Sequence, residues 1–231
     1  QRQMCIRDRV KDFIESEIYP KETELAKGTP EAREMLGSLM QLAKDEKIWA
    51  LGHPEDIGGG GMPFMEYVYV NEVIGRSSFA MVALGTHSLQ DSIMLREFAS
   101  PHWRDQYLEP LVQGEIFPSF GMTEPDVASS DPTQLQTTAI LENGTWKING
   151  TKWFTTGAAR AAYTTVMCRT ELDAPSHGAF SMIIVPTDNP GYKIVRETPV
   201  LGINGGHYEV KYDNVEVPEE NLLGPRGQGF I

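Results

Sequence analysis

The chain has 231 residues, 40% of them hydrophobic, and its 32 acidic side chains outnumber 20 basic ones to give a formal charge of −12. This length and composition allow one large globular domain or two modest ones with a packed core. The acidic balance leaves no broad basic surface for phosphate attraction, which argues against nucleic acid as a partner, although a few local cations could still bind a small anion.

The cysteines and the apolar runs indicate the compartment. Cys5 and Cys168 lie far apart, and Cys168 falls in an apolar, strand-like run, so we expect it to be a buried reduced thiol. No apolar run approaches the ~20 residues of a membrane span, and the N-terminus lacks a signal-peptide core. We therefore expect a soluble protein of the cytoplasm, or of the mitochondrial matrix in a eukaryote. The chain lacks an initiator methionine and ends in a Gly-rich phrase, so we also expect a fragment, cut at least at its C-terminus.

The first half of the chain has helical periodicity. The expected helices cover residues 9–27, 30–47, 64–82, 86–99 and 101–113. Pro20 would interrupt the first helix, whereas Pro30 suits the first turn of the second. The four consecutive glycines at 58–61 predict a loop, and Gly114 would end the last helix.

After Ile116 the hydrophobic period changes to two, and short segments rich in β-branched and aromatic residues alternate with Gly- and Asn-containing turns. The expected strands lie within 137–144, 145–150, 163–170, 180–187, 192–197 and 208–217. The predicted fold class is α+β multidomain: an all-α helical domain over residues 1–116, then an antiparallel β-barrel or sandwich domain over 117–225.

Two stretches crowd hydroxyl and glycine residues beside an aromatic: residues 120–131, FGMTEPDVASSD, and residues 150–157, GTKWFTTG. That composition suits a flat ligand with a polar rim, because hydroxyl and backbone donors can address the rim while an aromatic covers the face. A structural alternative exists for each part. An isolated Thr-Glu-Pro ends a strand and caps a turn, and a lone Trp153 is more often a core residue.

Other motifs indicate structure rather than chemistry. The glycines at 58–61 lack the Gly-Lys-Ser ending of a phosphate loop. His87 and His207 have no ligand spacing to another His or Cys, so no metal site is expected.

A helical region followed by a β region whose first loop reads MTEPDVASSD resembles the acyl-CoA dehydrogenase family of flavoproteins. The similar phrases run along nearly the whole chain: ALGHPEDIGGGG, LEPLVQGE, GMTEPDVASSD, INGTKWFTTGA and YDNVEVPEENLLGPRGQGF. The resemblance implies a helical domain, a middle β domain and a C-terminal four-helix bundle, in a homodimer or homotetramer. The bundle is absent from this sequence, where residues 226–231 would be its start. The family's catalytic base, a glutamate, belongs to that missing part, so no catalytic residue is assigned.

The activity implied by the resemblance is FAD-dependent α,β-dehydrogenation of an acyl-CoA thioester to the 2-enoyl-CoA, as in the β-oxidation of fatty acids. Electron-transfer flavoprotein would then accept the electrons. A flavin-dependent oxidase or monooxygenase of the same fold is one alternative, and a non-catalytic flavin- or CoA-binding remnant is another. The 231-residue piece alone is expected to bind FAD weakly and to show no turnover.

The resemblance also implies site residues. The cofactor side would consist of Phe120, Met122, Thr123, Ser129, Trp153, Phe154 and Thr155. Among these, Thr123 would line the pyrimidine edge of the flavin, Trp153 would cover its ring system, and Thr155 would reach N5 or O4. Ser130, which directly precedes Asp131, is favoured over Ser129 for the phosphate or pantetheine of the substrate, although an extra residue in this loop leaves that choice open. Glu124 would support the loop.

Overall fold

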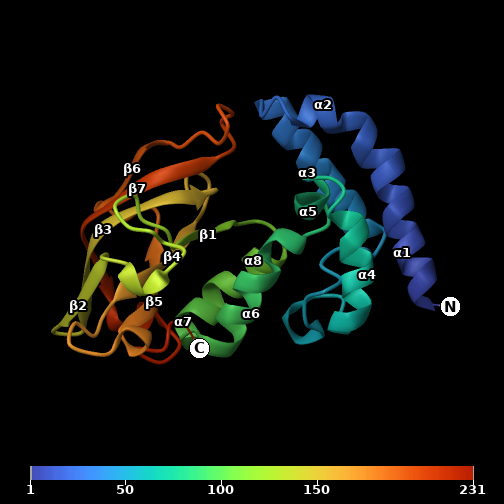
Figure 1. Cartoon of the computed structure of the whole chain (residues 1–231). Helices are drawn as coiled ribbons and strands as arrows, with labels where there is room; N and C mark the ends of the chain where they lie inside the picture. The colour runs from blue at the N-terminus through green and yellow to red at the C-terminus, as the bar shows by residue number, and fades with distance from the viewer. Residues whose placement is uncertain (1, 231) are drawn as a thin grey trace. The chain divides into compact units, whose positions relative to one another are not determined.

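The computed structural model describes residues 2–230, and within them the chain forms two compact units. One unit comprises Gln1–Ile93 and Leu108–Glu115, and the other comprises Met94–Tyr107 and Ile116–Ile231. The first is helical, whereas the second contains the strands, coloured from yellow-green to red in Figure 1. A helical region followed by a mostly antiparallel β region confirms the predicted fold class.

Most helices belong to the first unit. They are α1 (Arg2–Phe13), α2 (Glu22–Leu25), α3 (Pro30–Asp45), α4 (Phe64–Ile74), α5 (Ala80–Ala83), the first half of α6 (Leu89–Phe98) and α8 (Glu109–Val112). As the prolines predict, a π-helical turn (Ile14–Ile18) and a 3₁₀ turn (Tyr19–Lys21) separate α1 from α2, and α3 begins at Pro30. The Thr29 hydroxyl caps α3 by accepting a hydrogen bond from the Ala32 N–H at 3.2 Å.

The helix expected over 64–82 is in fact two helices. Helix α4 ends at Ile74, before Gly75, and α5 begins at Ala80. Between them the Ser77 hydroxyl accepts hydrogen bonds from the N–H groups of Phe79 and Ala80. A glycine followed by a capping serine ends one helix and begins the next, which the continuous apolar spacing concealed.

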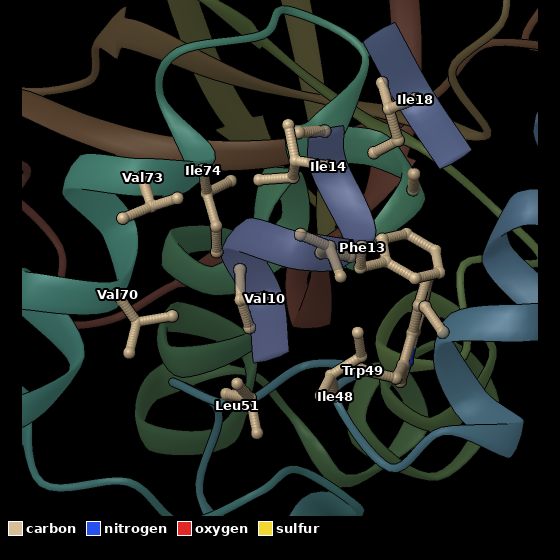
Figure 2. Packing of buried hydrophobic residues seen from close by; sticks show 14 of the residues in the cluster. Val10, Phe13, Ile14, Ile18, Ile48, Trp49, Leu51, Val70, Val73 and Ile74 are labelled. Carbon is tan, nitrogen blue, oxygen red and sulfur yellow. The ribbon is translucent and has the colours of Figure 1, made fainter. Parts of the chain in front are cut away.

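The core of the helical unit consists of side chains from three parts of the chain: the N-terminal helical region, the segment that follows α3, and helix α4 (Figure 2). Its buried side chains include Val10, Phe13, Ile14, Ile18, Ile48, Trp49, Leu51, Val70, Val73 and Ile74. The indole N–H of Trp49 donates to the carbonyl of Val112 at 3.0 Å. Burying these groups supplies most of the favourable free energy that holds the helices together.

His53 makes the stability of the helical unit depend on pH. Its side chain is 1% exposed, and Nε2 lies 3.3 Å from the Ser88 hydroxyl. Burial lowers the pKa of His53 from 6.5 to about 4. Between these two values the unfolded chain binds a proton that the folded chain does not, so stability is lost as the pH falls from about 6.5 towards 4, by roughly 2–3 kcal/mol.

Urea denaturation of the wild type and of His53→Gln at pH 7 and pH 4.5 measures this effect. The His53→Gln variant should lose less stability between the two pH values than the wild type does. Exposed His177 provides the control, because His177→Gln should keep the wild-type dependence. Equal pH dependence in the wild type and His53→Gln would contradict the assignment.

Within residues 2–230, the β unit contains eight strands in one sheet. They are β1 (Pro118–Gly121), β2 (Thr138–Glu142), β3 (Thr145–Thr156), β4 (Tyr163–Arg169), β5 (Phe180–Pro186), β6 (Tyr192–Glu197), β7 (His207–Pro218) and β8 (Leu222–Leu223). The order is β6-β7-β3-β2-β4-β5-β8, with β1 beside β4. Most pairs are antiparallel, as expected, but β1 runs parallel to β4, and Thr138 of β2 pairs in parallel with Arg169 of β4.

One hydrophobic cluster receives side chains from six of these strands, so the sheet folds around a common core. Its members include Ala139, Trp146, Ile148, Val166, Cys168, Ile183, Tyr192, Val210, Tyr212 and Val217. Cys168 is free and completely buried, as predicted. Burial raises the pKa of its thiol to about 12, which makes Cys168 a packing residue rather than a nucleophile.

The β unit also includes a helical segment that the sequence assigned to the helical domain. Met94–Tyr107, which contains α7 (Pro101–Trp103), belongs with the strands. Trp103 is 1% exposed, stacks on Tyr107 with ring centroids 4.2 Å apart, and meets Tyr163 of β4 edge to face at 5.5 Å. The boundary expected at residue 116 therefore follows the change of secondary structure. Packing, in contrast, places Met94–Tyr107 with the residues after 115.

Within residues 2–230, no helix combines the length and apolar character needed to cross a membrane. No three metal-binding side chains gather in that same range.

Candidate functional site

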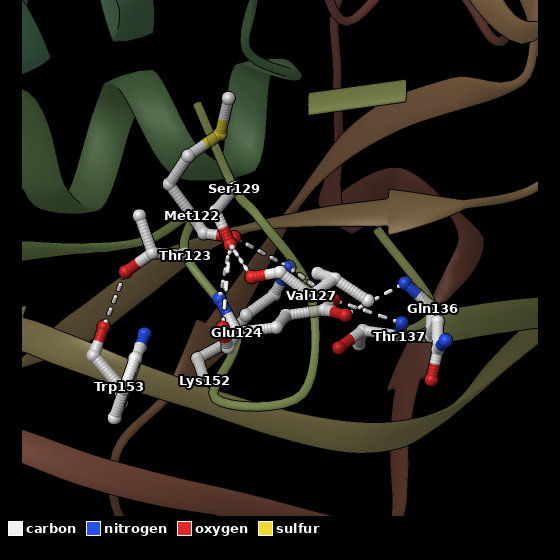
Figure 3. Close-up of polar contacts among 9 residues, drawn as sticks. All are labelled: Met122, Thr123, Glu124, Val127, Ser129, Gln136, Thr137, Lys152 and Trp153. Atoms are coloured by element: carbon white, nitrogen blue, oxygen red, sulfur yellow. Dashed lines mark hydrogen bonds and ion pairs between the residues drawn. The ribbon is translucent and has the colours of Figure 1, made fainter. Parts of the chain in front are cut away.

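The two stretches singled out in the sequence are hydrogen-bonded to each other, and Figure 3 shows the bond from the Thr123 hydroxyl to the Trp153 carbonyl. The Trp153 N–H donates to the Thr123 carbonyl at 3.0 Å, and the Thr123 hydroxyl donates to the Trp153 carbonyl at 2.7 Å. Thr123 follows the end of β1, and Trp153 lies within β3. The loop after β1 is thus fixed to a defined position along β3.

A β-bulge interrupts β3 at this position. Lys152 pairs with Val210 of β7 and Thr155 pairs with Tyr208, so β3 carries one residue more than β7 between these pairs. Phe154 within the bulge has a φ of 50°, and the residue is 39% exposed. A bulky residue in the left-handed region costs about 1–3 kcal/mol, and such residues concentrate at functional sites. The bulge therefore presents an aromatic ring to solvent at an energetic cost.

The bulge also resets which side chains of β3 face outward. Thr155 is completely buried, and its hydroxyl has no hydrogen-bond partner among residues 2–230. Thr156 is exposed, and its Oγ1 is hydrogen-bonded to His207 Nδ1 at 2.8 Å. The Phe154 ring meets the His207 ring edge to face, with centroids 6.4 Å apart. The structure therefore favours Thr156 over Thr155 as the hydroxyl that a ligand can reach, and it adds His207, which the sequence considered only as a metal ligand.

The loop between β1 and β2 separates the roles of its two serines. The Ser129 hydroxyl accepts from the Glu124 N–H at 2.9 Å and lies 3.3 Å from the Glu124 carbonyl, to which it donates. Ser130 is exposed. Ser129 therefore holds the loop in shape, whereas Ser130 is the serine whose hydroxyl is accessible from outside.

The remaining predicted residues lie next to this loop. Phe120 lies in β1, and Met122 is the first residue after that strand. Both are half-buried, as are Thr123 and Trp153. Except for Thr155, the predicted cofactor residues thus have side chains that are at least partly accessible.

Beneath the loop lies a buried ion pair that the sequence did not reveal. Lys152 Nζ and Glu124 Oε1 are 2.9 Å apart, and their side chains are 0% and 4% exposed. Lys152 also donates to the Met122 carbonyl at 2.8 Å, and the Glu124 carboxylate accepts from the N–H groups of Gln136 and Thr137 at 2.7 and 2.9 Å. A signal was present in the sequence, because the even-numbered residues Trp146 and Ile148 of β3 face the core and Lys152 continues their alternation.

The pair has opposing electrostatic contributions. Burial alone would raise the pKa of the Glu124 carboxyl, but the charge and hydrogen bond of Lys152, with the donors at Gln136 and Thr137, hold that pKa below its usual value. Burial lowers the pKa of Lys152, and Glu124 opposes that shift. Glu124 is therefore an ionised carboxylate whose oxygens accept hydrogen bonds from Lys152, Gln136 and Thr137. It supports the loop, as expected from the sequence.

The outward-facing groups suit a planar heteroaromatic ligand. Phe154 offers an apolar ring, while the Thr156 hydroxyl and the His207 imidazole offer hydrogen bonds beside it. An aromatic surface with a few polar groups at its edge is the usual lining of a cofactor site. The donor set thus fits the ring system of a flavin.

Comparison with known proteins gives a consistent result. Residues 1–115 match the model of the acyl-CoA dehydrogenase N-terminal domain, and residues 119–215 match that of the acyl-CoA dehydrogenase middle domain. The chain is 38% identical over 238 residues to "Probable acyl-CoA dehydrogenase FadE2" of Mycobacterium tuberculosis, covering 97% of this chain and 58% of the relative. It is 34% identical over 240 residues to "Acyl-CoA dehydrogenase family member 10" of Mus musculus, covering 96% of this chain and 22% of the relative.

A solved structure is similar over the whole chain. The "putative acyl-CoA dehydrogenase from Mycobacterium abscessus" superposes with a TM-score of 0.90 at 33% identity, covering 100% of this chain and 62% of that one. The chain thus spans less than two thirds of each of these three proteins.

Proposed function

Because the chain belongs to the acyl-CoA dehydrogenase family, we propose that it forms the helical and β parts of an enzyme that oxidises an acyl-CoA thioester to the 2-enoyl-CoA with FAD. The observation that carries this proposal is the bulge in β3. It exposes Phe154 beside Thr156 and His207, and the Thr123–Trp153 hydrogen bonds hold it against the loop after β1. An oxidoreductase is the class that family membership supports, and the specific reaction is our inference.

FAD, when bound, would supply the hydride acceptor that no amino-acid side chain can provide. The chain's own residues would bind and orient it. Phe154 would cover part of the ring system, and the hydroxyl of Thr156, held by His207, would hydrogen-bond at its edge. Phe120, Met122 and Thr123 would line the opposite rim. Alignment of this kind makes a large contribution to rate, because the donor and the acceptor then start close to the reacting geometry.

On the substrate side, exposed Ser130 is proposed to contact the phosphate or pantetheine of the acyl-CoA. Glu124 is committed to the buried pair, so the proton acceptor for the α-carbon is proposed to come from outside this sequence. We further propose that electron-transfer flavoprotein accepts the electrons and that the full-length enzyme is a homo-oligomer. The proposed compartment is the cytoplasm or the mitochondrial matrix.

The direct test is anaerobic mixing of the full-length gene product with acyl-CoA thioesters of different chain length in a stopped-flow spectrophotometer. We expect bleaching of the flavin absorbance near 450 nm and formation of the enoyl-CoA. Rapid reoxidation in air with stoichiometric peroxide would instead identify an oxidase. Isolation of a protein that takes up no flavin would support the non-catalytic alternative.

Two neighbouring threonines test which hydroxyl serves the cofactor. Thr156→Val should weaken FAD binding about three- to tenfold, the range expected for one lost hydrogen bond. Thr155→Val is the matched control, because it also replaces a hydroxyl by a methyl group. It removes a buried hydroxyl that has no hydrogen-bond partner within residues 2–230. It should therefore leave FAD affinity unchanged and raise the melting temperature slightly. Fluorescence titration with FAD and thermal denaturation measure the two effects. The reverse pattern would restore Thr155 as the ligand.

A further inference from the structure

We propose that Lys152 is a positioning residue, whose buried ammonium holds the loop after β1 against the bulge of β3 and so sets the geometry of the cofactor-facing residues. The inference rests on the proposed function in one respect, namely that this surface binds FAD.

The contacts of Lys152 reach both sides of the junction. Lys152 directly precedes Trp153 in β3, and its Nζ donates to the Met122 carbonyl at 2.8 Å and to Glu124 Oε1 at 2.9 Å. Thr123 lies between these two acceptors and is the residue that exchanges hydrogen bonds with Trp153. One ammonium group therefore fixes the residues on both sides of Thr123 (Figure 3).

Glu124 extends the junction to a third segment. Its carboxylate accepts from the N–H groups of Gln136 and Thr137, immediately before β2. The aliphatic stem of Lys152 is also closely packed, since a Cβ on Gly121 would lie 3.3 Å from Lys152 Cγ and 3.0 Å from the Tyr212 hydroxyl. Since the Lys152 side chain is also 0% exposed, protein groups rather than solvent surround its ammonium.

A charged pair is a poor choice if stability alone is required at this position. Removing two charges from water costs about as much as their attraction returns, and well-packed apolar residues of similar volume often stabilise a core equally well. An ammonium offers something that a methionine cannot, which is directed hydrogen bonds to the Met122 carbonyl and the Glu124 carboxylate together. The structure therefore assigns Lys152 to the orientation of the loop rather than to the bulk of the core.

The test compares Lys152→Met and the double variant Lys152→Met/Glu124→Gln with the wild type, in the full-length gene product. The double variant leaves no unpaired charge, so we expect it to fold even if Lys152→Met does not. Hydrogen exchange of peptides covering residues 150–157 reports on the Trp153 N–H without any cofactor. FAD titration reports on the cofactor surface.

In the double variant we expect exchange at residues 150–157 to become at least tenfold faster, peptides from β4 and β5 to keep wild-type exchange, and the Kd for FAD to rise at least tenfold. The control is Lys193→Met, which removes an exposed ion pair with Asp213 in the same sheet and should change neither readout. Uniformly faster exchange across the β unit would show a merely structural role and overturn the proposal. Wild-type exchange together with a wild-type Kd would also overturn it. If the wild type itself binds no FAD, the proposed function fails, whereas the exchange data still decide the role of Lys152.

Discussion

Glu124→Gln is expected to lower the free energy of unfolding by about 3–5 kcal/mol, because it leaves the ammonium of Lys152 buried without a compensating charge. The Lys152 side chain is 0% exposed, so solvent cannot replace the carboxylate. The amide also cannot accept from both backbone N–H groups as well as the carboxylate does, since one of its two ends is a donor. Urea denaturation at pH 7 measures the loss.

The loss should become smaller as the pH rises. Burial lowers the pKa of Lys152 already in the wild type, and removing the Glu124 charge removes the interaction that opposes this shift. Above the folded-state pKa the folded variant releases the proton, whereas the unfolded chain keeps it up to about pH 10.4, so the folded state gains stability relative to the unfolded state over that window. Asp213→Asn, at an exposed pair, should leave the denaturation midpoint near the wild type. A Glu124→Gln variant with the wild-type midpoint would show that the pair contributes nothing.

Gly150→Ala is expected to cost about 3 kcal/mol, because β3 has no space for a methyl group at this position. A Cβ would lie 2.3 Å from Thr137 Oγ1 and 2.7 Å from Thr137 Cα. Rotation of the Thr137 side chain cannot relieve the contact with Cα. Movement of the backbone is opposed as well, since the Thr137 N–H is held by Glu124 Oε1 at 2.9 Å.

The matched control for this substitution is Gly144→Ala. Gly144 has a φ of 77°, but nothing lies within 4 Å of a Cβ built there. Its replacement should therefore cost only the backbone strain, about 1 kcal/mol. Because Gly150 also has a positive φ, of 155°, the difference between the two variants in thermal or urea denaturation reports mainly on the added contact with Thr137. Equal destabilisation of the two would mean that the segment around Thr137 yields to the added methyl.

Local sequence signals were sufficient for most of the fold. Proline positions, glycine turns and the change of hydrophobic period predicted the helical region, the interruption near Pro20 and six strand segments after Ile116, but not β1, β8 or the second half of β3. Packing between distant segments was not predictable in the same way. The parallel pairing of β1 with β4 and the association of Trp103 with Tyr163 depend on partners far away in the sequence, and periodicity carries no information about them.

The candidate site was predictable in composition but not in register. The motifs identified the two stretches that meet at Thr123 and Trp153. The resemblance implied Thr155 as the hydroxyl that reaches the cofactor, but the bulge inserts one residue into β3, so that Thr155 is buried and Thr156 is exposed. An aromatic residue in the left-handed region has no sequence signature comparable to that of glycine, so the bulge at Phe154 could be found only in the structure.

The assignment of Met94–Tyr107 to the β unit has a consequence for folding during synthesis. When these residues leave the ribosome, the strand that covers Trp103 has not yet been translated, because Tyr163 lies well downstream in the chain. The side chains of this segment that are buried in the folded chain, Leu95, Ala99 and Trp103, must therefore stay exposed while the loop after β1 and β3 are made, and exposed apolar side chains attract chaperones or other nascent chains. Slower translation after residue 107 would lengthen that interval, and faster translation would shorten it. Yield in the cell should then depend on codon choice between residues 108 and 163 more than on codon choice near either end.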